Sequence, residues 1–176
     1  MIFNFSNDTS AQFDTRKVAY AVVLAAIGIA LAPYTSFPVG IAKINPTQHL
    51  VNVLGAVLLG PWWATAIAAI VAIIRNMMGV GTLLAFPGGM IGAFLAGICY
   101  RKWRHLYVGA AGEIIGTGLI APVASALFIA PVLMGKAIPL FALLPSFLGS
   151  TIVGACLGVF ALKLLVAAGV VDLSTS

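Results

Sequence analysis

The amino-acid sequence predicts an all-α membrane protein, a bundle of six transmembrane helices with the N- and C-termini in the cytoplasm. Of its 176 residues, 62% are hydrophobic and 7% are charged, whereas soluble domains are about 45–50% apolar and about 25% charged. A chain of this length can supply about six spans of roughly 20 residues and leaves no room for a second soluble domain. Lys and Arg lie between the apolar segments in the positions expected of cytoplasmic loops.

The chain divides into a polar N-terminal tail over residues 1–15, a membrane domain over 16–168 and a C-terminal tail over 169–176. The N-terminal tail lacks the apolar core of a signal peptide, so we do not expect it to be cleaved as one. This organisation predicts a multi-pass protein of the cell membrane.

The first three spans are separated by turn-forming residues. The first follows Arg16 and Lys17 and should end at Pro33, because proline lacks the N–H that continues a helix. A loop rich in turn residues, PYTSFPVGIAKINPT, comes next. The second span covers about residues 50–60, and a Gly-Pro break separates it from the third, which covers about 61–78.

The last three spans are longer and end at clearer boundaries. The fourth covers about 87–100 and stops at the charged stretch RKWRH. The fifth covers 106–134, which exceeds one membrane thickness and contains Pro122 and Pro131. We therefore expect a tilted or kinked helix there, with a separate short helical piece after Pro122 as the alternative. The sixth covers about 139–168.

The basic residues support this path, because short cytoplasmic loops are enriched in Lys and Arg. With both termini inside, two lysines, Lys43 and Lys136, lie in outer loops, and Arg75 lies near the outer end of the third span. Six basic residues lie inside: Arg16, Lys17, Arg101, Lys102, Arg104 and Lys163. The net charge of +5 is too scattered to indicate nucleic-acid binding.

The two cysteines, Cys99 and Cys156, lie in apolar runs without a CxxC spacing. We interpret them as small core residues and predict no metal site, no disulfide and no cofactor.

A group of polar residues stands at the start of the second span, in the stretch KINPTQHLVN. Asn45 or Thr47 can cap the helix, and Pro46 suits its first turn. Capping does not account for Gln48, His49 and Asn52, which share one side of the helix. Because lipid excludes such a patch, we expect it to face the protein interior, either as one wall of a small-molecule pocket or as interhelical contacts.

Other polar and aromatic residues are predicted on the same side of the membrane. Glu113 is the only acid clearly inside a span, and Thr117 shares its face at i+4. Arg75 either contacts the ligand or extends to the outer interface, and an ion pair between Arg75 and Glu113 would need strong helix tilt. Glu113 alternatively joins helices as a protonated or hydrogen-bonded carboxyl. The remaining candidates are Tyr34, Phe37, Asn76, Thr82, Phe86 and Ser125.

These motifs suggest a family. The ordered stretches KINPTQHLVNVLGAVLLGPWWA, RNMMGVGTLLAFPGGMIGAFLAG and GEIIGTG resemble the ThiW type of substrate-binding S component of energy-coupling factor (ECF) transporters, over about residues 17–165. The resemblance implies a six-helix protein of thiamin salvage that captures hydroxyethylthiazole from outside, with the first loop as a lid. A neutral thiazole suits Gln48, His49 and Asn52, whereas thiamin or its pyrimidine would suit an ionised Glu113.

The resemblance also implies partners, namely a transmembrane coupling subunit and two ATPase subunits. S components resemble one another in an AxxxA pattern on the first helix that docks on the coupling subunit, and Ala21 with Ala25 is favoured over Ala26 with Ala30. The chain has no Walker A motif, so ATP hydrolysis is expected in the partners. No HExxH or GxSxG motif supports the alternative of a small intramembrane enzyme, and we predict no catalytic residue. A purely structural membrane subunit is a further alternative, which the polar cluster disfavours.

Overall fold

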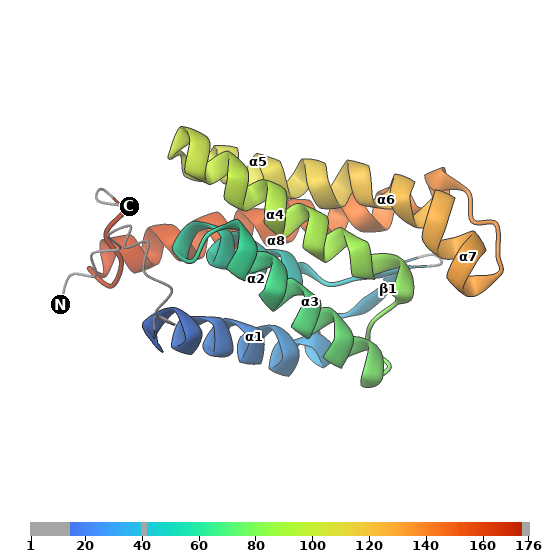
Figure 1. The fold of residues 1–176 in the computed structure, drawn as a ribbon, viewed down its shortest axis with the longest axis horizontal. Coiled ribbons are helices and arrows are strands. Elements are labelled where there is room, and N and C mark those ends of the chain that lie inside the picture. The colour runs from blue at the N-terminus through green and yellow to red at the C-terminus, as the bar shows by residue number, and fades with distance from the viewer. Residues whose placement is uncertain (1–14, 40–41, 174–176) are drawn as a thin grey trace.

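The computed structural model describes residues 15–39 and 42–173, and these form a helical bundle with one small β-hairpin (Figure 1). Three of the described helical spans are long and apolar enough to cross a membrane, namely Thr15–Thr35, Leu106–Met134 and Leu140–Ala167. In chain order the elements are α1 (Thr15–Thr35), β1 (Phe37–Val39), β2 (Ala42–Ile44), α2 (Pro46–Leu58), α3 (Pro61–Met77), η1 (Leu83–Ala85), α4 (Phe86–Trp103), α5 (Leu106–Ile115), η2 (Gly116–Ile120), α6 (Ala121–Ala124), η3 (Ser125–Ile129), α7 (Ala130–Met134) and α8 (Leu140–Ala167).

The bundle has two distinct ends (Figure 1). At one end α1 begins, α8 finishes, and the α2–α3 and α4–α5 connections turn; we call this the terminal end. At the other end lie the β-hairpin, the α3–η1–α4 connection and α7; we call this the hairpin end. The distribution of basic residues predicts that the terminal end faces the cytoplasm.

Helix α2 occupies the centre of the bundle and packs against α1, α3, α4, α5 and α8. The side chain of Asn45 caps it by accepting from the backbone N–H of Gln48 at 2.9 Å, and Pro46 takes its first position. Of the two predicted caps, Asn45 and Thr47, the structure has Asn45, and the helix begins at Pro46, a few residues before its apolar part. Its 13 residues rise only about 20 Å, which is shorter than the roughly 30 Å hydrocarbon layer.

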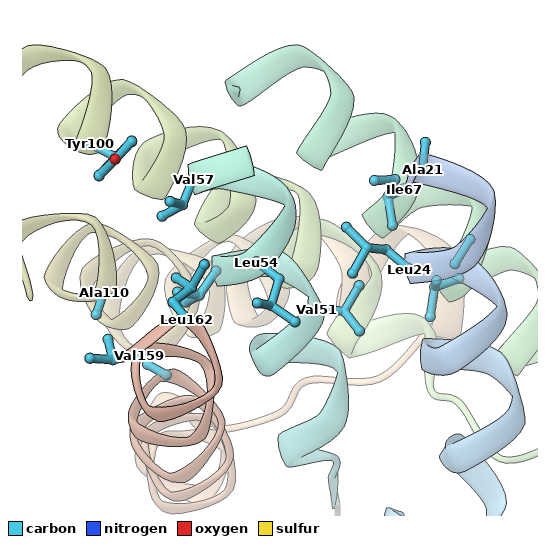
Figure 2. Close-up of a cluster of buried hydrophobic side chains, with 14 residues drawn as sticks. Ala21, Leu24, Val51, Leu54, Val57, Ile67, Tyr100, Ala110, Val159 and Leu162 are labelled. Atoms are coloured by element: carbon cyan, nitrogen blue, oxygen red, sulfur yellow. The ribbon is translucent and has the colours of Figure 1, made fainter. Parts of the chain in front are cut away.

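The apolar core surrounds the terminal-end half of α2. Figure 2 shows Val51, Leu54 and Val57 of α2 between side chains of α1 and α3 on one side and of α4, α5 and α8 on the other. Leu162 of α8 is fully buried in this cluster. Packing of this kind stabilises the bundle, because protein interiors fill space as densely as organic crystals.

The fifth span is one continuous helix whose regular winding is interrupted by two π-helical segments, η2 and η3. Each π segment lies just before a proline, in the stretches LIAPV and FIAPV. Proline lacks the N–H that an α-helical carbonyl would accept, and a locally wider turn accommodates this loss without ending the helix. The predicted distorted helix is confirmed, and the alternative of a separate piece after Pro122 is not needed.

Glycines allow α4 and the fifth span to touch through their backbones. A Cβ added at Gly116 would lie 2.6 Å from the Cα of Gly92. Side chains cannot fit at such a separation, so the two helices meet as in the small-residue contacts common among membrane helices.

Two boundaries differ from the predictions. Helix α1 continues past Pro33 to Thr35, because a proline removes only its own N–H bond to the carbonyl four residues earlier and leaves the following residues able to stay helical. The segment after it, predicted as an irregular loop, forms an antiparallel hairpin in which Phe37 pairs with Ile44 and Val39 with Ala42. Its β-branched and aromatic residues suit strands, and the turn-forming residues around them hide this signal.

Candidate functional site

A small polar cavity lies at the hairpin end, where the start of α2 meets α3, η2, α8 and strand β2. Its volume of about 20 Å³ is enough for about one water molecule. The residues that line it are Lys43, Asn45, Gln48, His49, Arg75, Thr117, Ser146, Phe147 and Ser150. The predicted inward orientation of the polar face of α2 is confirmed, since Gln48, His49 and Asn52 are all buried.

Behind the cavity, the carboxyl group of Glu113 joins three helical segments. It has no exposed surface, and its Oε1 lies 2.8 Å from His49 Nδ1, 3.0 Å from Asn52 Nδ2 and 3.0 Å from Thr117 Oγ1. Hydrogen bonds and an opposite charge are what a carboxyl group needs when it is removed from water. Glu113 therefore anchors α2 to the fifth span.

Helix α4 adds two backbone acceptors to this network. The amide of Asn52 donates its second N–H to the carbonyl of Gly89 at 3.0 Å. The hydroxyl of Thr117 lies 2.9 Å from the carbonyl of Gly88 and also contacts Glu113. A hydroxyl has a single hydrogen, so it can donate to only one of these two acceptors at a time. A proton on Glu113 would let the carboxyl donate to Thr117 while Thr117 donates to Gly88. The network therefore accommodates both protonation states of Glu113.

His49 is oriented by the same contact. Its Nδ1 faces Glu113, so with an ionised carboxylate this nitrogen carries the hydrogen and donates it. The other ring nitrogen, Nε2, does not take part in this contact, and His49 lines the cavity. A neutral His49 offers an acceptor there, and a protonated His49 offers a donor.

A second polar chain connects α2 to α3 and to the start of the hairpin. Arg75 donates through a terminal nitrogen to Gln48 Oε1, and its other terminal nitrogen lies 3.5 Å from Ser36 Oγ. Asn45 Nδ2 donates to the same Ser36 oxygen at 2.7 Å. The backbone N–H of Asn45 donates to Ser150 Oγ of α8 at 2.7 Å. These contacts fix the start of α2 between three other elements.

Glycines of α4 make room for this network. A Cβ at Gly89 would lie 2.1 Å from Gln48 Nε2, and a Cβ at Gly92 would lie 2.0 Å from Thr117 Oγ1. Any larger residue at these two positions would displace the polar side chains. The glycine stretch of α4 thus lets a helix backbone form one wall behind the site.

Several buried polar atoms of the site have no hydrogen-bond partner within the described residues. They include two donor groups, Gln48 Nε2 and Arg75 Nε, and two acceptors, Asn52 Oδ1 and Glu113 Oε2. Buried polar groups are usually paired because desolvation is costly. Gln48 and Arg75 line the cavity, so their unpaired donors lie on residues that a ligand in the cavity can contact.

The structure brings together six of the predicted site residues, namely Gln48, His49, Asn52, Arg75, Glu113 and Thr117. Gln48, His49, Arg75 and Thr117 line the cavity, and Asn52 and Glu113 lie behind it. The remaining candidates lie outside this group. Tyr34 and Phe37 are exposed, Thr82 and Phe86 are half-buried elsewhere, Asn76 donates to Ala72 of its own helix, and Ser125 donates to the carbonyl of Leu84.

The structure decides between the alternatives left open for two charged residues. Glu113 pairs with His49 rather than with Arg75, because the start of α2 lies between the two. Arg75 does not extend to the outer interface, since it is only 3% exposed and donates to Gln48.

Sequence reasoning missed the contribution of α8 and of the hairpin. Ser146, Phe147 and Ser150 line the cavity from α8, and Lys43 lines it from β2. Ser146 and Ser150 are four residues apart in an apolar span, so their shared face was a detectable signal.

The small residues of α1 are distributed differently from the expectation. Ala21 and Ala25 lie buried in the core cluster, so they cannot form a docking face. Ala26 and Ala30 lie on the exposed side of α1. Burial therefore disfavours Ala21 with Ala25 as a docking pair, whereas Ala26 with Ala30, the other predicted pair, is accessible.

Comparisons with known proteins agree with this architecture. The model of the ThiW family, described as thiamine-precursor transporter proteins, matches residues 18–168. No curated protein sequence matches the chain. The solved structure of the S component of a bacterial ECF transporter is similar in fold, with a TM-score of 0.72 and 16% sequence identity; the match covers 88% of this chain and 97% of that one.

Proposed function

Because this chain belongs to the ThiW family of thiamine-precursor transporter proteins, we propose that it captures hydroxyethylthiazole as the substrate-binding subunit of an ECF-type importer. Its family makes it a multi-pass protein of the cell membrane and a transporter rather than an enzyme. The fold it shares with an S component supports the assignment to that type of subunit. The observation that carries the proposal is the polar cavity under the hairpin.

The charges around the cavity favour a neutral ligand over a cationic one. Lys43 and Arg75 both line the cavity, and they would repel the positive charge of thiamin. The acid that could have balanced such a charge, Glu113, already interacts with His49, Asn52 and Thr117 through one oxygen. The thiazole alcohol carries no charge at neutral pH and avoids this repulsion.

The hydrogen-bonding groups of the site also match a thiazole alcohol. Its ring nitrogen is an acceptor, and its hydroxyl both donates and accepts. Gln48 Nε2 and Arg75 Nε are buried donors without partners, and His49 keeps its second ring nitrogen for a ligand. Phe147 adds an aromatic surface to the cavity, on which a flat ring can pack.

The cavity must enlarge before a thiazole can bind, because its present volume of about 20 Å³ is close to that of one water molecule. The hairpin is the element to move. Ser146 Oγ donates to the carbonyl of Val39 at 2.8 Å, and Lys43 Nζ donates to the carbonyl of Gly79 at 2.8 Å. The first bond contributes about 1 kcal/mol net and the bond from the charged ammonium about 1.5–3 kcal/mol, so opening the hairpin is energetically accessible.

Calorimetry on the purified full-length protein tests the ligand assignment. We expect hydroxyethylthiazole to bind without ATP with a dissociation constant of roughly micromolar or below, and thiamin to bind more weakly. The variant Gln48→Ala should weaken binding, whereas Asn76→Ala should not, because Asn76 bonds to its own helix. Absence of binding to any thiazole or pyrimidine would remove the proposal.

We also propose that the exposed face of α1 with Ala26 and Ala30 docks on the transmembrane coupling subunit, which acts with two ATPase subunits. Small residues let another helix approach closely. Ala26→Trp should reduce co-purification of the coupling subunit while thiazole binding persists. Val132→Trp, on an exposed part of α7, serves as the control and should not affect co-purification.

A further inference from the structure

A groove on the outside of the bundle runs between α5 and α8 toward the terminal end. Its volume is about 340 Å³, far larger than the polar cavity, and its lining is almost entirely apolar. The side walls include Ala111 and Ile114 of α5 and Cys156 and Phe160 of α8. Such a trough accommodates a flexible hydrocarbon chain but has few groups that could bind a polar solute.

One cation borders this apolar groove. Lys163 donates to the hydroxyl of Tyr107, and its Nζ lies 4.8 Å from the centroid of the Tyr107 ring. An ammonium group has three N–H donors, so two remain after this bond. Tyr107 therefore holds the charge in place beside the groove and leaves it able to bind an acceptor.

A second groove at the same end of the bundle repeats this arrangement. It lies between α3 and α4, has a volume of about 380 Å³ and combines Trp62, Phe94 and Ile98 with Arg101 and Lys102. The rings of Trp62 and Phe94 pack edge to face at 5.1 Å. Two separate grooves thus join an apolar trough to cations at the end predicted to face the cytoplasm.

We infer that the α5–α8 groove binds one acyl chain of an anionic phospholipid and that Lys163 binds its phosphate. The cytoplasmic leaflet is rich in anionic lipid, and basic residues near its surface attract that lipid. A protein helix placed over the groove would bury the Lys163 ammonium, which is costly unless the helix supplies an acid. A phospholipid brings both the chain and the negative charge.

Native mass spectrometry of the full-length protein from mixed micelles of phosphatidylglycerol and phosphatidylcholine tests this site. Lys163→Gln should lower retained phosphatidylglycerol about fivefold, and Ala111→Phe, which fills the groove, should lower it as well. Lys136→Gln removes the same charge at the hairpin end, where Lys136 is exposed, and should leave retention unchanged. Thermal unfolding and elution volume verify that each variant is folded.

Three outcomes would overturn the inference. Equal retention of phosphatidylglycerol by all variants would mean that the groove holds no specific lipid. Equal retention of both lipids by the wild-type protein would indicate ordinary solvation of the apolar surface. If Ala111→Phe leaves lipid retention unchanged but prevents co-purification of the coupling subunit, the groove is a protein interface. None of these results depends on thiazole binding.

Discussion

The two halves of α2 are equally buried but chemically opposite. Asn52 is 1% exposed and its neighbour Val53 is fully buried, yet one belongs to a polar network and the other to the apolar core. The terminal-end half, with Leu54 and Val57, belongs to the hydrophobic core cluster. The hairpin-end half, with Gln48 and His49, depends on partners from α3, α4, the fifth span and α8.

This difference separates the half of the helix that builds the apolar core from the half that we propose contributes to ligand binding. Apolar residues at the start of α2 would stabilise it without any need for partners. A buried polar group, in contrast, loses its contacts with water and must form hydrogen bonds to offset that cost. The polar half does not recover it fully, since Gln48 Nε2 and Asn52 Oδ1 have no partner within the described residues. Unpaired buried groups are rare in folded proteins, and under the proposed function a ligand would pair with them.

Among the substitutions that compare the two halves of α2, Glu113→Ala should have the largest effect. The substitution leaves His49, Asn52 and Thr117 without their shared acceptor, and breaking a buried pair costs about 3–5 kcal/mol. We expect a correspondingly lower free energy of unfolding and no measurable thiazole binding, by denaturant titration and calorimetry in detergent. Glu113→Gln keeps the volume and one carbonyl oxygen and should lose less. Wild-type stability in Glu113→Ala would show that the network contributes little.

A substitution in the apolar half of α2 should lower stability without changing thiazole affinity. Leu54→Ala creates a cavity and should lower the free energy of unfolding by about 2–4 kcal/mol. Because Leu54 does not line the polar cavity, the thiazole affinity of the folded fraction should be unchanged. A loss of affinity matching that of Glu113→Ala would mean that the two halves act as one unit.

Gly92→Ala tests the space between α4 and the polar half. The added Cβ would lie 2.0 Å from Thr117 Oγ1 and 2.7 Å from Glu113 Oε2, and overpacking of this kind costs about 1–3 kcal/mol. Thiazole affinity should fall with stability. Gly149→Ala is the matched control, because nothing lies within 4 Å of its added Cβ; it should keep affinity and leave stability equal or higher. Equal effects of the two substitutions would contradict the close contact.

The smallest effect is expected for Thr117→Val. It removes one hydroxyl at nearly constant volume and should cost about 1 kcal/mol of stability, since His49 and Asn52 still contact Glu113. Affinity should fall more than it does for Thr65→Val, whose hydroxyl bonds only to Pro61 of its own helix. Calorimetry on both variants makes the comparison, and a larger loss for Thr65→Val would count against a role for Thr117 at the site.

Local patterns in the sequence predicted the parts of the site that lie on one helix. The cap at Asn45, the inward face of Gln48, His49 and Asn52, and the shared face of Glu113 and Thr117 all follow from helical spacing. The pairing of His49 with Glu113 does not, because it depends on the relative depth of two helices. Counting residues along each span placed Arg75 and Glu113 separately but could not show that α2 begins between them.

The hairpin and the contribution of α8 were missed for different reasons. Strands of three residues carry little periodic signal, and prolines and glycines around them indicate a loop. Ser146 and Ser150 do carry a helical signal, but serine is common in packed membrane helices. These hydroxyls line the cavity only because α8 packs against the start of α2. Such long-range packing cannot be inferred from a single sequence.

The bond from Lys43 to the carbonyl of Gly79 ties the hairpin to the connection that follows α3. One ammonium group thus links two segments at the hairpin end that are far apart in the chain. Release of the hairpin requires loss of this bond and of the bond from Ser146 to Val39, and the first of these bonds ends at the segment that follows the helix of Arg75. Under the proposed function, opening of the hairpin for a ligand would therefore be coupled to the position of the Arg75 guanidinium.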